Sequence, residues 1–128
     1  MTVALVSPAT AVTGPTIVPT TGPTLKLTVF QVKVHKVSPR GSEFVTLLNT
    51  GRADTPIGGW RLRDRIGRVL VLPKFSLRAG ASVKVYTGKG RSTSHALFLN
   101  KRTDQWHAIH DTARLYDARG SAIDSLRY

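Results

Sequence analysis

The sequence contains no cysteine, and this absence removes two classes of structure. A disulfide framework needs paired thiols, and a structural zinc site of the common type needs thiolate ligands. The 128 residues must therefore be held together by a hydrophobic core of their own, for which a single domain of this length is sufficient.

Acidic residues are also few, with 7 Asp and Glu against 19 Lys and Arg and a formal net charge of +12. A surface of this sign attracts polyanions such as nucleic acid, anionic cell-wall polymers or acidic lipid headgroups. Arginine outnumbers lysine by 12 to 7. The planar guanidinium fork suits phosphate oxygens, so this preference favours a phosphate-bearing partner.

The first 24 residues carry no charge and consist mainly of Thr, Pro, Val and Ala. Their four prolines prevent a long helix and favour an extended linker, and no apolar run is long enough to cross a membrane. The first charged residue is Lys26, and a different pattern begins at Leu25. We therefore expect a disordered Thr/Pro-rich tail over residues 1–24 and one folded domain over residues 25–128.

The start of the tail permits two interpretations. Residues 9–11 have the small-x-small form of a signal-peptide cleavage site and follow the apolar residues 3–6. The start would then lie inside a longer signal peptide, and the protein would be secreted or attached to the cell surface. However, residues 1–11 lack a basic start and their apolar run is short, which equally fits a tail without a targeting role.

From residue 25 onward the hydrophobic period is two and a helical period is absent, which predicts strands throughout. The phase changes at Val29-Phe30, which indicates a β-bulge or a bend. Residues 49–56 have the composition of a loop. Later strands are predicted at residues 42–49, 60–63, 68–72, 75–77, 82–86, 96–99, 112–116 and 121–127. Eight or nine short strands of this spacing predict an all-β Greek-key sandwich.

Two tetrapeptides of the form Asp-x-x-Gly join consecutive predicted strands, at residues 64–67 and 117–120. Aspartate at the first position of a type I turn accepts backbone N–H bonds, and glycine at the fourth position tolerates a positive φ. We therefore expect two β-hairpins with the same turn chemistry. Trp60 is expected in the core, whereas Trp106 could either cap the sandwich or remain a partly exposed contact.

Several segments together match one family in their amino-acid sequence and in their order along the chain. They are residues 41–51, 59–64, 79–88 and 111–117, with Trp106, Gly120, Asp124 and Ser125. The chain from residue 25 to 128 resembles the lamin tail domain, which implies an immunoglobulin-like Greek-key β-sandwich. One departure is His110, where the family usually has glycine. The isolated format, without a preceding coiled coil, resembles the exported bacterial members, in which this domain is a non-catalytic attachment.

Residues for catalysis, for a metal or for a cofactor are not evident. His107-x-x-His110 with Asp104 and Asp111 lies in a predicted loop, which gives potential ligands no defined geometry, so solvated histidines are the preferred interpretation. The sequence contains neither a G-x-S-x-G motif nor a complete phosphate-binding loop around Gly88 and Gly90. We therefore predict a protein that is not an enzyme and that has no cofactor and no metal site.

The acidic residues have structural explanations. Asp64 and Asp117 belong to turns, and Asp111 is placed to cap backbone N–H groups before a strand. Glu43 and Asp124 lie on strands among many cations, where ion pairs are a sufficient explanation. The acids therefore leave no carboxylate pair for general acid–base catalysis.

The basic residues give the clearest indication of function. Arg61 and Arg63 share one face of a hairpin, and Lys84 and Arg114 point outward from strands that could be sheet neighbours. The candidate polyanion-binding residues are Arg61, Arg63, Arg65, Arg68, Lys84, Lys89, Arg91 and Arg114. The sequence thus predicts a module that binds an anionic polymer or surface. DNA association, a protein partner with incidental charge, and a merely solvated basic face remain the alternatives.

Overall fold

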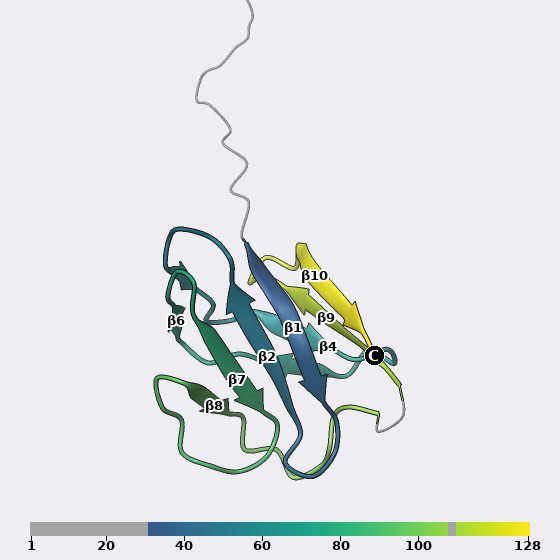
Figure 1. Ribbon diagram of the computed structural model, residues 1–128. Coiled ribbons are helices and arrows are strands. Elements are labelled where there is room, and N and C mark those ends of the chain that lie inside the picture. The colour runs from purple at the N-terminus through teal and green to yellow at the C-terminus, as the bar shows by residue number, and fades with distance from the viewer. Residues whose placement is uncertain (1–30, 108–109) are drawn as a thin grey trace, which may run out of the picture.

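Two four-stranded sheets face each other in the computed structural model, which describes residues 31–107 and 110–128 (Figure 1). One sheet has the order β1-β2-β7-β8, with β1 at Val32–Ser38, β2 at Phe44–Asn49, β7 at Ser82–Tyr86 and β8 at Ala96–Phe98. The other has the order β10-β9-β4-β5, with β10 at Ala122–Arg127, β9 at Thr112–Tyr116, β4 at Arg61–Arg63 and β5 at Val69–Val71. The predicted all-β sandwich is confirmed.

The expected bulge or bend at Val29-Phe30 and the expected tail over residues 1–24 lie outside the described residues. Within the described ranges the chain forms strands, turns and loops, and no helix of membrane-spanning length and hydropathy occurs there.

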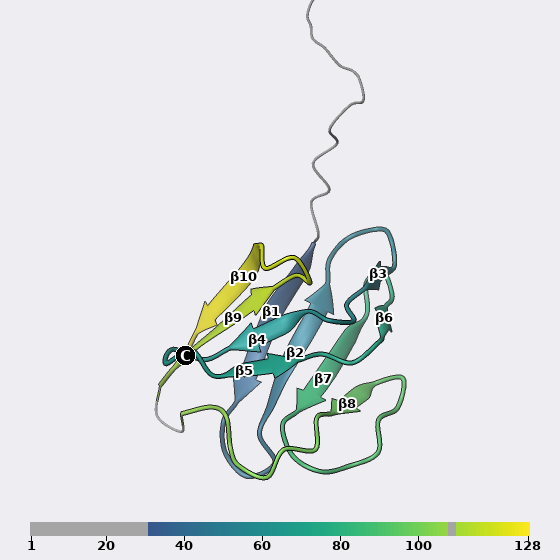
Figure 2. The ribbon, with the colours of Figure 1, turned by 180° about the vertical axis from the view of Figure 1, so that it is seen from behind.

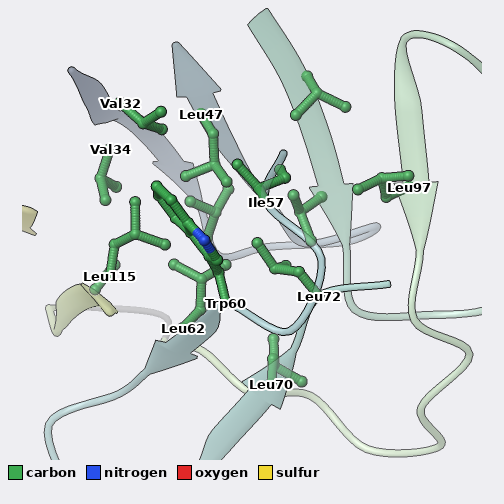
Figure 3. Close-up of a cluster of buried hydrophobic side chains, with 14 of the residues drawn as sticks. Val32, Val34, Leu47, Ile57, Trp60, Leu62, Leu70, Leu72, Leu97 and Leu115 are labelled. Carbon is green, nitrogen blue, oxygen red and sulfur yellow. The ribbon is translucent and has the colours of Figure 1, made fainter. Parts of the chain in front are cut away.

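The hydrophobic core fills the space between the two sheets. Leu62 of β4 and Leu115 of β9 point inward from one sheet, and Val45 and Leu47 of β2 point inward from the other. Figure 3 shows Trp60 among Leu47, Leu62 and Leu115, and Trp60 is 3% exposed. Burial of a large apolar side chain contributes about 1.5–3 kcal/mol, so this cluster supplies the main stabilising term. The predicted core position of Trp60 is confirmed.

A small third sheet corrects the loop expected over residues 49–56. Within this segment, β3 at Thr55–Pro56 pairs with β6 at Ser76–Leu77. The buried side chain of Asn49 explains the pairing, because its Nδ2 donates to the carbonyl oxygens of Ala53 and Leu77, both at 2.9 Å. These bonds join segments far apart in the sequence, so local composition alone does not reveal them.

One side of the sandwich is closed where β1 of one sheet meets β10 of the other. The pairing of β1 with β2 shifts between Val34 and Lys36, and the N–H of Val34 donates to Asp124 Oδ2 of β10 at 2.7 Å. The ion pair expected for Asp124 is not found within residues 31–107 and 110–128; its carboxylate joins β1 to β10 through a backbone amide.

The ion pair expected for Glu43 is likewise not found in the part of the chain that the structure describes. This residue is 3% exposed, and its carboxylate accepts hydrogen bonds from the backbone N–H groups of Gln105 at 2.6 Å and Trp106 at 3.1 Å. Trp106 is itself buried, at 4% exposure. A carboxylate that is bonded to backbone amides can be buried without a cationic partner. Glu43 therefore holds the loop before β9 against the end of the sandwich, and Trp106 completes the core there.

Candidate functional site

The outer face of the β10-β9-β4-β5 sheet gathers four of the eight predicted binding residues. On β4, the buried Leu62 separates the exposed Arg61 and Arg63. Across the strand pair, Arg63 lies opposite Arg114 of β9, and Arg61 lies opposite Tyr116. Because side chains at paired positions project to the same face, three arginines and a tyrosine share this surface. Arg65 adds a fourth arginine from the adjoining turn.

A hollow of about 330 Å³ lies at the end of this face. Its lining comes from the first Asp-x-x-Gly turn and from β4 and β9: Arg63, Asp64, Arg65, Ile66, Gly67, Arg114 and Tyr116. The guanidinium carbon of Arg63 lies 5.5 Å from the centre of the Tyr116 ring, which is cation–π geometry. This contact orients Arg63 while leaving its N–H donors available at the edge of the hollow. We call Arg61, Arg63, Arg65 and Arg114 the arginine face.

Asp64 builds the turn that carries Arg65. Its Oδ1 accepts hydrogen bonds from the backbone N–H groups of Ile66 at 3.1 Å and Arg68 at 2.7 Å, and Gly67 has a φ of 92°. The predicted turn chemistry is confirmed here. It is also confirmed in the second hairpin, where Asp117 Oδ1 accepts from the N–H groups of Arg119 and Ser121 and Gly120 has a φ of 91°.

Arg68 differs from the other arginines of this hairpin because its guanidinium is used within the protein. Its Nε lies 2.6 Å from Asp64 Oδ2, and its Nη2 donates to the carbonyl oxygen of Gln105 at 2.7 Å. Its Nη1 reaches the carbonyl oxygen of Asp104 at 3.3 Å. We therefore assign Arg68 to the fold and leave it outside the arginine face.

Lys84, Lys89 and Arg91 belong to the opposite layer of the sandwich. Lys84 lies on β7, whose neighbours are β2 and β8, so the expectation that it adjoins Arg114 is wrong. Its Nζ lies 4.9 Å from the centre of the Phe44 ring on that sheet. Lys89 and Arg91 are exposed in the loop between β7 and β8. Alternation along a strand predicts an outward side chain, but it does not predict which sheet the strand joins.

Comparison with protein families gives one clear result. A family model described as Lamin Tail Domain matches residues 25–128. The chain belongs to the lamin tail domain family. The sandwich is accordingly of the immunoglobulin-like type, as expected, and the family consists in general of non-catalytic binding or structural modules. A search of curated proteins finds none that matches the chain.

In this lamin tail domain, the two loop histidines do not belong to a metal-binding cluster that the structure describes. The rings of His107 and His110 lie 5.7 Å apart, but residues 31–107 and 110–128 contain no group of three His, Cys, Asp or Glu side chains that could hold a metal. Asp111, the nearest carboxylate in sequence, is occupied by backbone hydrogen bonds. Its Oδ2 accepts from the N–H of His107 at 3.1 Å.

Asp111 connects both hairpins of the domain. Its Oδ1 accepts from the N–H groups of Arg65 at 2.9 Å and Thr112 at 2.7 Å, and its backbone pairs in both directions with Tyr128. Burial acts to raise the pKa of Asp111, but these amide bonds and that from His107, together with the charge of Arg65, hold the pKa below its ordinary value. The predicted cap is confirmed, and its bond to Arg65 reaches the turn beside the arginine face.

The sequence interpretation missed three exposed apolar residues beside the arginine face. Ile66 is 69% exposed, Val71 is 54% exposed and Val69 is 41% exposed. The signal was present in residues 68–72, where valine and leucine alternate, because only one of the two phases can face the core. Leu70 and Leu72 face the core, so Val69 and Val71 face outward beside Arg63 and Arg61.

Proposed function

We propose that this lamin tail domain attaches to an anionic polymer that carries phosphate groups, and that the arginine face is the contact surface. The observation that carries the proposal is the placement of Arg63, Arg65 and Arg114 around one open hollow. Asp64 is the acidic residue in the lining, and it is 1% exposed and paired with Arg68. The solvent side of the hollow is therefore cationic, and guanidinium groups bind phosphate oxygens in a bidentate manner.

The recognition expected of this face is directed at a polymer backbone. Its flat strands offer no helix for a groove of duplex DNA, and the four arginines are spaced along β4, β9 and the adjoining turn. Contacts of this kind release counterions, so affinity falls with a slope of about −0.9 per phosphate contact on a log–log plot against salt. With about three contacts, raising salt fourfold weakens binding roughly 40-fold.

The test compares two polymers and two charge-matched variants. Binding of fluorescent duplex DNA and of a glycerol-phosphate wall polymer is measured by anisotropy as salt is increased. Replacing Arg61 and Arg63 with Glu is expected to abolish binding while circular dichroism shows an unchanged fold. The control replaces Lys33 and Lys36, two exposed residues of β1, with Glu, which changes net charge equally on the other sheet.

The two variants separate a local site from general attraction. If the β1 variant weakens binding as much as the β4 variant, the arginine face is not the site. The polymer that binds more tightly at physiological salt identifies the class of partner. If neither polymer binds, the proposal is overturned.

We further propose that the protein is bacterial and acts outside the cell, with residues 1–24 as the linker and residues 25–128 as the attachment domain. The support is the match of residues 25–128 to a family that includes exported bacterial members, together with the small-x-small triplet at residues 9–11. Fractionation of the producing cells, followed by N-terminal sequencing of the protein, tests both statements. A mature protein that is retained inside the cell would contradict them.

A further inference from the structure

The two main sheets have four outer edges, and they differ in how they are covered. The edge at β1 meets β10 through the bond from Val34 N–H to Asp124, so these two edges cover each other. The edge at β8 is covered by the preceding loop, because Thr93 N–H donates to Ala96 O at 2.7 Å and Phe98 N–H donates to Ser92 Oγ at 3.0 Å. The fourth edge is β5, which lies at the margin of its sheet in Figure 2.

The backbone of β5 bonds to β4 on one side. Leu72 N–H donates to Trp60 O at 2.8 Å, and Arg68 O accepts from Asp64 N–H at 3.1 Å. Because inward and outward groups alternate in an antiparallel pair, the N–H and C=O groups of Val69 and Val71 point away from β4. Gln105 Nε2 covers Arg68 O at the start of the strand. Beyond that point, nothing in the described part of the chain bonds to this side of β5.

The same hairpin carries every large hydrophobic side chain that is exposed within the described residues. These are Ile66, Val69 and Val71. Exposed edge strands are normally protected by lysine, proline or a bulge, because an open edge is a template for another strand. Here the two outward side chains of the edge strand are β-branched and apolar, which favours pairing with an added strand.

The charge beside this edge indicates which strand would be accepted. Arg63 lies opposite Val69 and Arg61 lies opposite Val71, so each valine has an arginine next to it on the outer face. An added strand would lie about 10 Å from β4, which is two strand spacings and within reach of an arginine paired with a carboxylate. Pairing of two β5 edges would instead bring two sets of arginines together, in a chain of net charge +12.

We propose that the β5 edge binds an extended acidic segment of a protein partner, which adds to the sheet as a strand beyond β5. Its backbone bonds to Val69 and Val71, its apolar side chains pack on these valines, and its carboxylates face Arg61 and Arg63. This function shares Arg61 and Arg63 with polymer attachment and goes beyond it, because it also uses backbone groups of β5 that a polyanion does not need. Main-chain pairing provides the affinity, and alternate side chains provide the specificity.

The first measurement uses the unaltered protein and a defined probe. The probe is an eight-residue peptide with the pattern Glu-Thr-Val-Thr repeated twice, which places glutamate and valine on the same face of an added strand, and the control peptide has proline at both valine positions. The control keeps the charge but loses half of the backbone donors that face β5. We expect the probe to bind and the control to bind at least tenfold more weakly. Hydrogen exchange should slow at the amides of Val69 and Val71 and stay unchanged at Leu70 and Leu72, which already bond to β4.

A pair of variants tests the same edge from the protein side. Val71→Pro removes an outward N–H, which an edge strand tolerates, whereas Val71→Thr keeps the N–H and the β-branched shape. We expect Val71→Pro to lower the affinity for the probe about tenfold, which is the effect of one lost hydrogen bond and its packing. Val71→Thr should change the affinity less than threefold. Both variants should bind duplex DNA as the native protein does, which separates this inference from the polymer proposal.

Three results would overturn the inference. Equal binding of the glutamate–valine and glutamate–proline peptides would show adsorption to the arginines alone. Unchanged exchange at Val69 and Val71 in the peptide complex would exclude strand addition, whether or not the proline variant folds. A concentration-dependent dimer that Val71→Pro abolishes would assign the edge to a second copy of the chain.

Discussion

The two Asp-x-x-Gly hairpins have the same turn and different surroundings. In the first, Asp64 N–H donates to Arg68 O at 3.1 Å and Gly67 N–H donates to Asp64 O at 3.2 Å; in the second, Asp117 N–H donates to Ser121 O at 2.9 Å and Gly120 N–H donates to Asp117 O at 3.0 Å. Local sequence therefore produces the same backbone twice.

The surroundings decide what each hairpin contributes. The β9–β10 hairpin is held against β1 through Asp124, and its pairing is irregular between Ala122 and Asp124. The β4–β5 hairpin ends at an open edge, presents exposed valines and carries the turn that lines the hollow. Turn chemistry is therefore determined by the local sequence, whereas the exposure and binding capacity of each hairpin depend on which distant strand packs beside it.

The largest expected difference between the hairpins follows from removing their aspartates. Asp64 is 1% exposed and accepts from two backbone amides and from the Arg68 guanidinium, whereas Asp117 is 8% exposed and its carboxylate accepts from two backbone amides. Loss of a charged, buried acceptor is costly because its donors are left without partners. We expect Asp64→Ala to lower the free energy of unfolding by about 3 kcal/mol and Asp117→Ala by about 2 kcal/mol, measured by urea denaturation.

The corresponding asparagine variants serve as controls. Asparagine keeps an acceptor oxygen for the turn amides, so Asp117→Asn should recover most of the loss at the second turn. Asp64→Asn should recover less, because the ionic bond to Arg68 remains absent. Equal recovery at both turns would show that Arg68 does not distinguish the hairpins.

Local features of this kind could be predicted from the sequence, and features that depend on strand order could not. Alternation was enough to place Arg61 and Arg63 on one face, with Leu62 and Trp60 in the core. It was not enough to separate Lys84 from Arg114, because that assignment depends on which distant strand each one pairs with. Nothing close in sequence determines such a pairing.

The acidic residues also show that local sequence does not reveal contacts between distant segments. Glu43 and Asp124 accept hydrogen bonds from backbone amides of loops and strands more than sixty positions away. Composition offered many cations as partners, so ion pairs were the natural expectation. The structure instead uses these carboxylates to join segments, which leaves the arginines of β4 and β9 free of acidic neighbours other than the buried Asp64 among the described residues.

A smaller and equal effect is expected from the turn glycines. Gly67 and Gly120 have φ values of 92° and 91°, and an added Cβ would meet no atom closer than 3.9 Å at the first and none within 4 Å at the second. The cost of alanine is therefore conformational, about 1–2 kcal/mol at each site. Thermal unfolding of Gly67→Ala and Gly120→Ala should show similar losses. Unequal losses would mean that the two turns are not equivalent locally.

The smallest expected effect concerns Asp111, whose bonds to Arg65 and Tyr128 link the first hairpin to the end of the second. The pKa of Asp111 is held below its ordinary value in the folded protein. A carboxyl of this kind contributes stability above its unfolded pKa of about 4, and the contribution is lost as pH falls through the folded pKa. Asp111→Asn should therefore cost about 1 kcal/mol at neutral pH, and the difference from the native protein should shrink in acid.

Urea denaturation at a series of pH values measures this difference directly. The native protein should lose stability more steeply than Asp111→Asn as the solution is acidified, because only the native protein must protonate this carboxyl. The link also predicts a functional consequence: without the charge of Asp111, the bond that anchors the turn carrying Arg65 becomes weaker, so polymer binding should weaken slightly while the β9–β10 turn is unaffected. A pH-independent difference between the two proteins would show that packing, and not the charge of Asp111, joins the two hairpins.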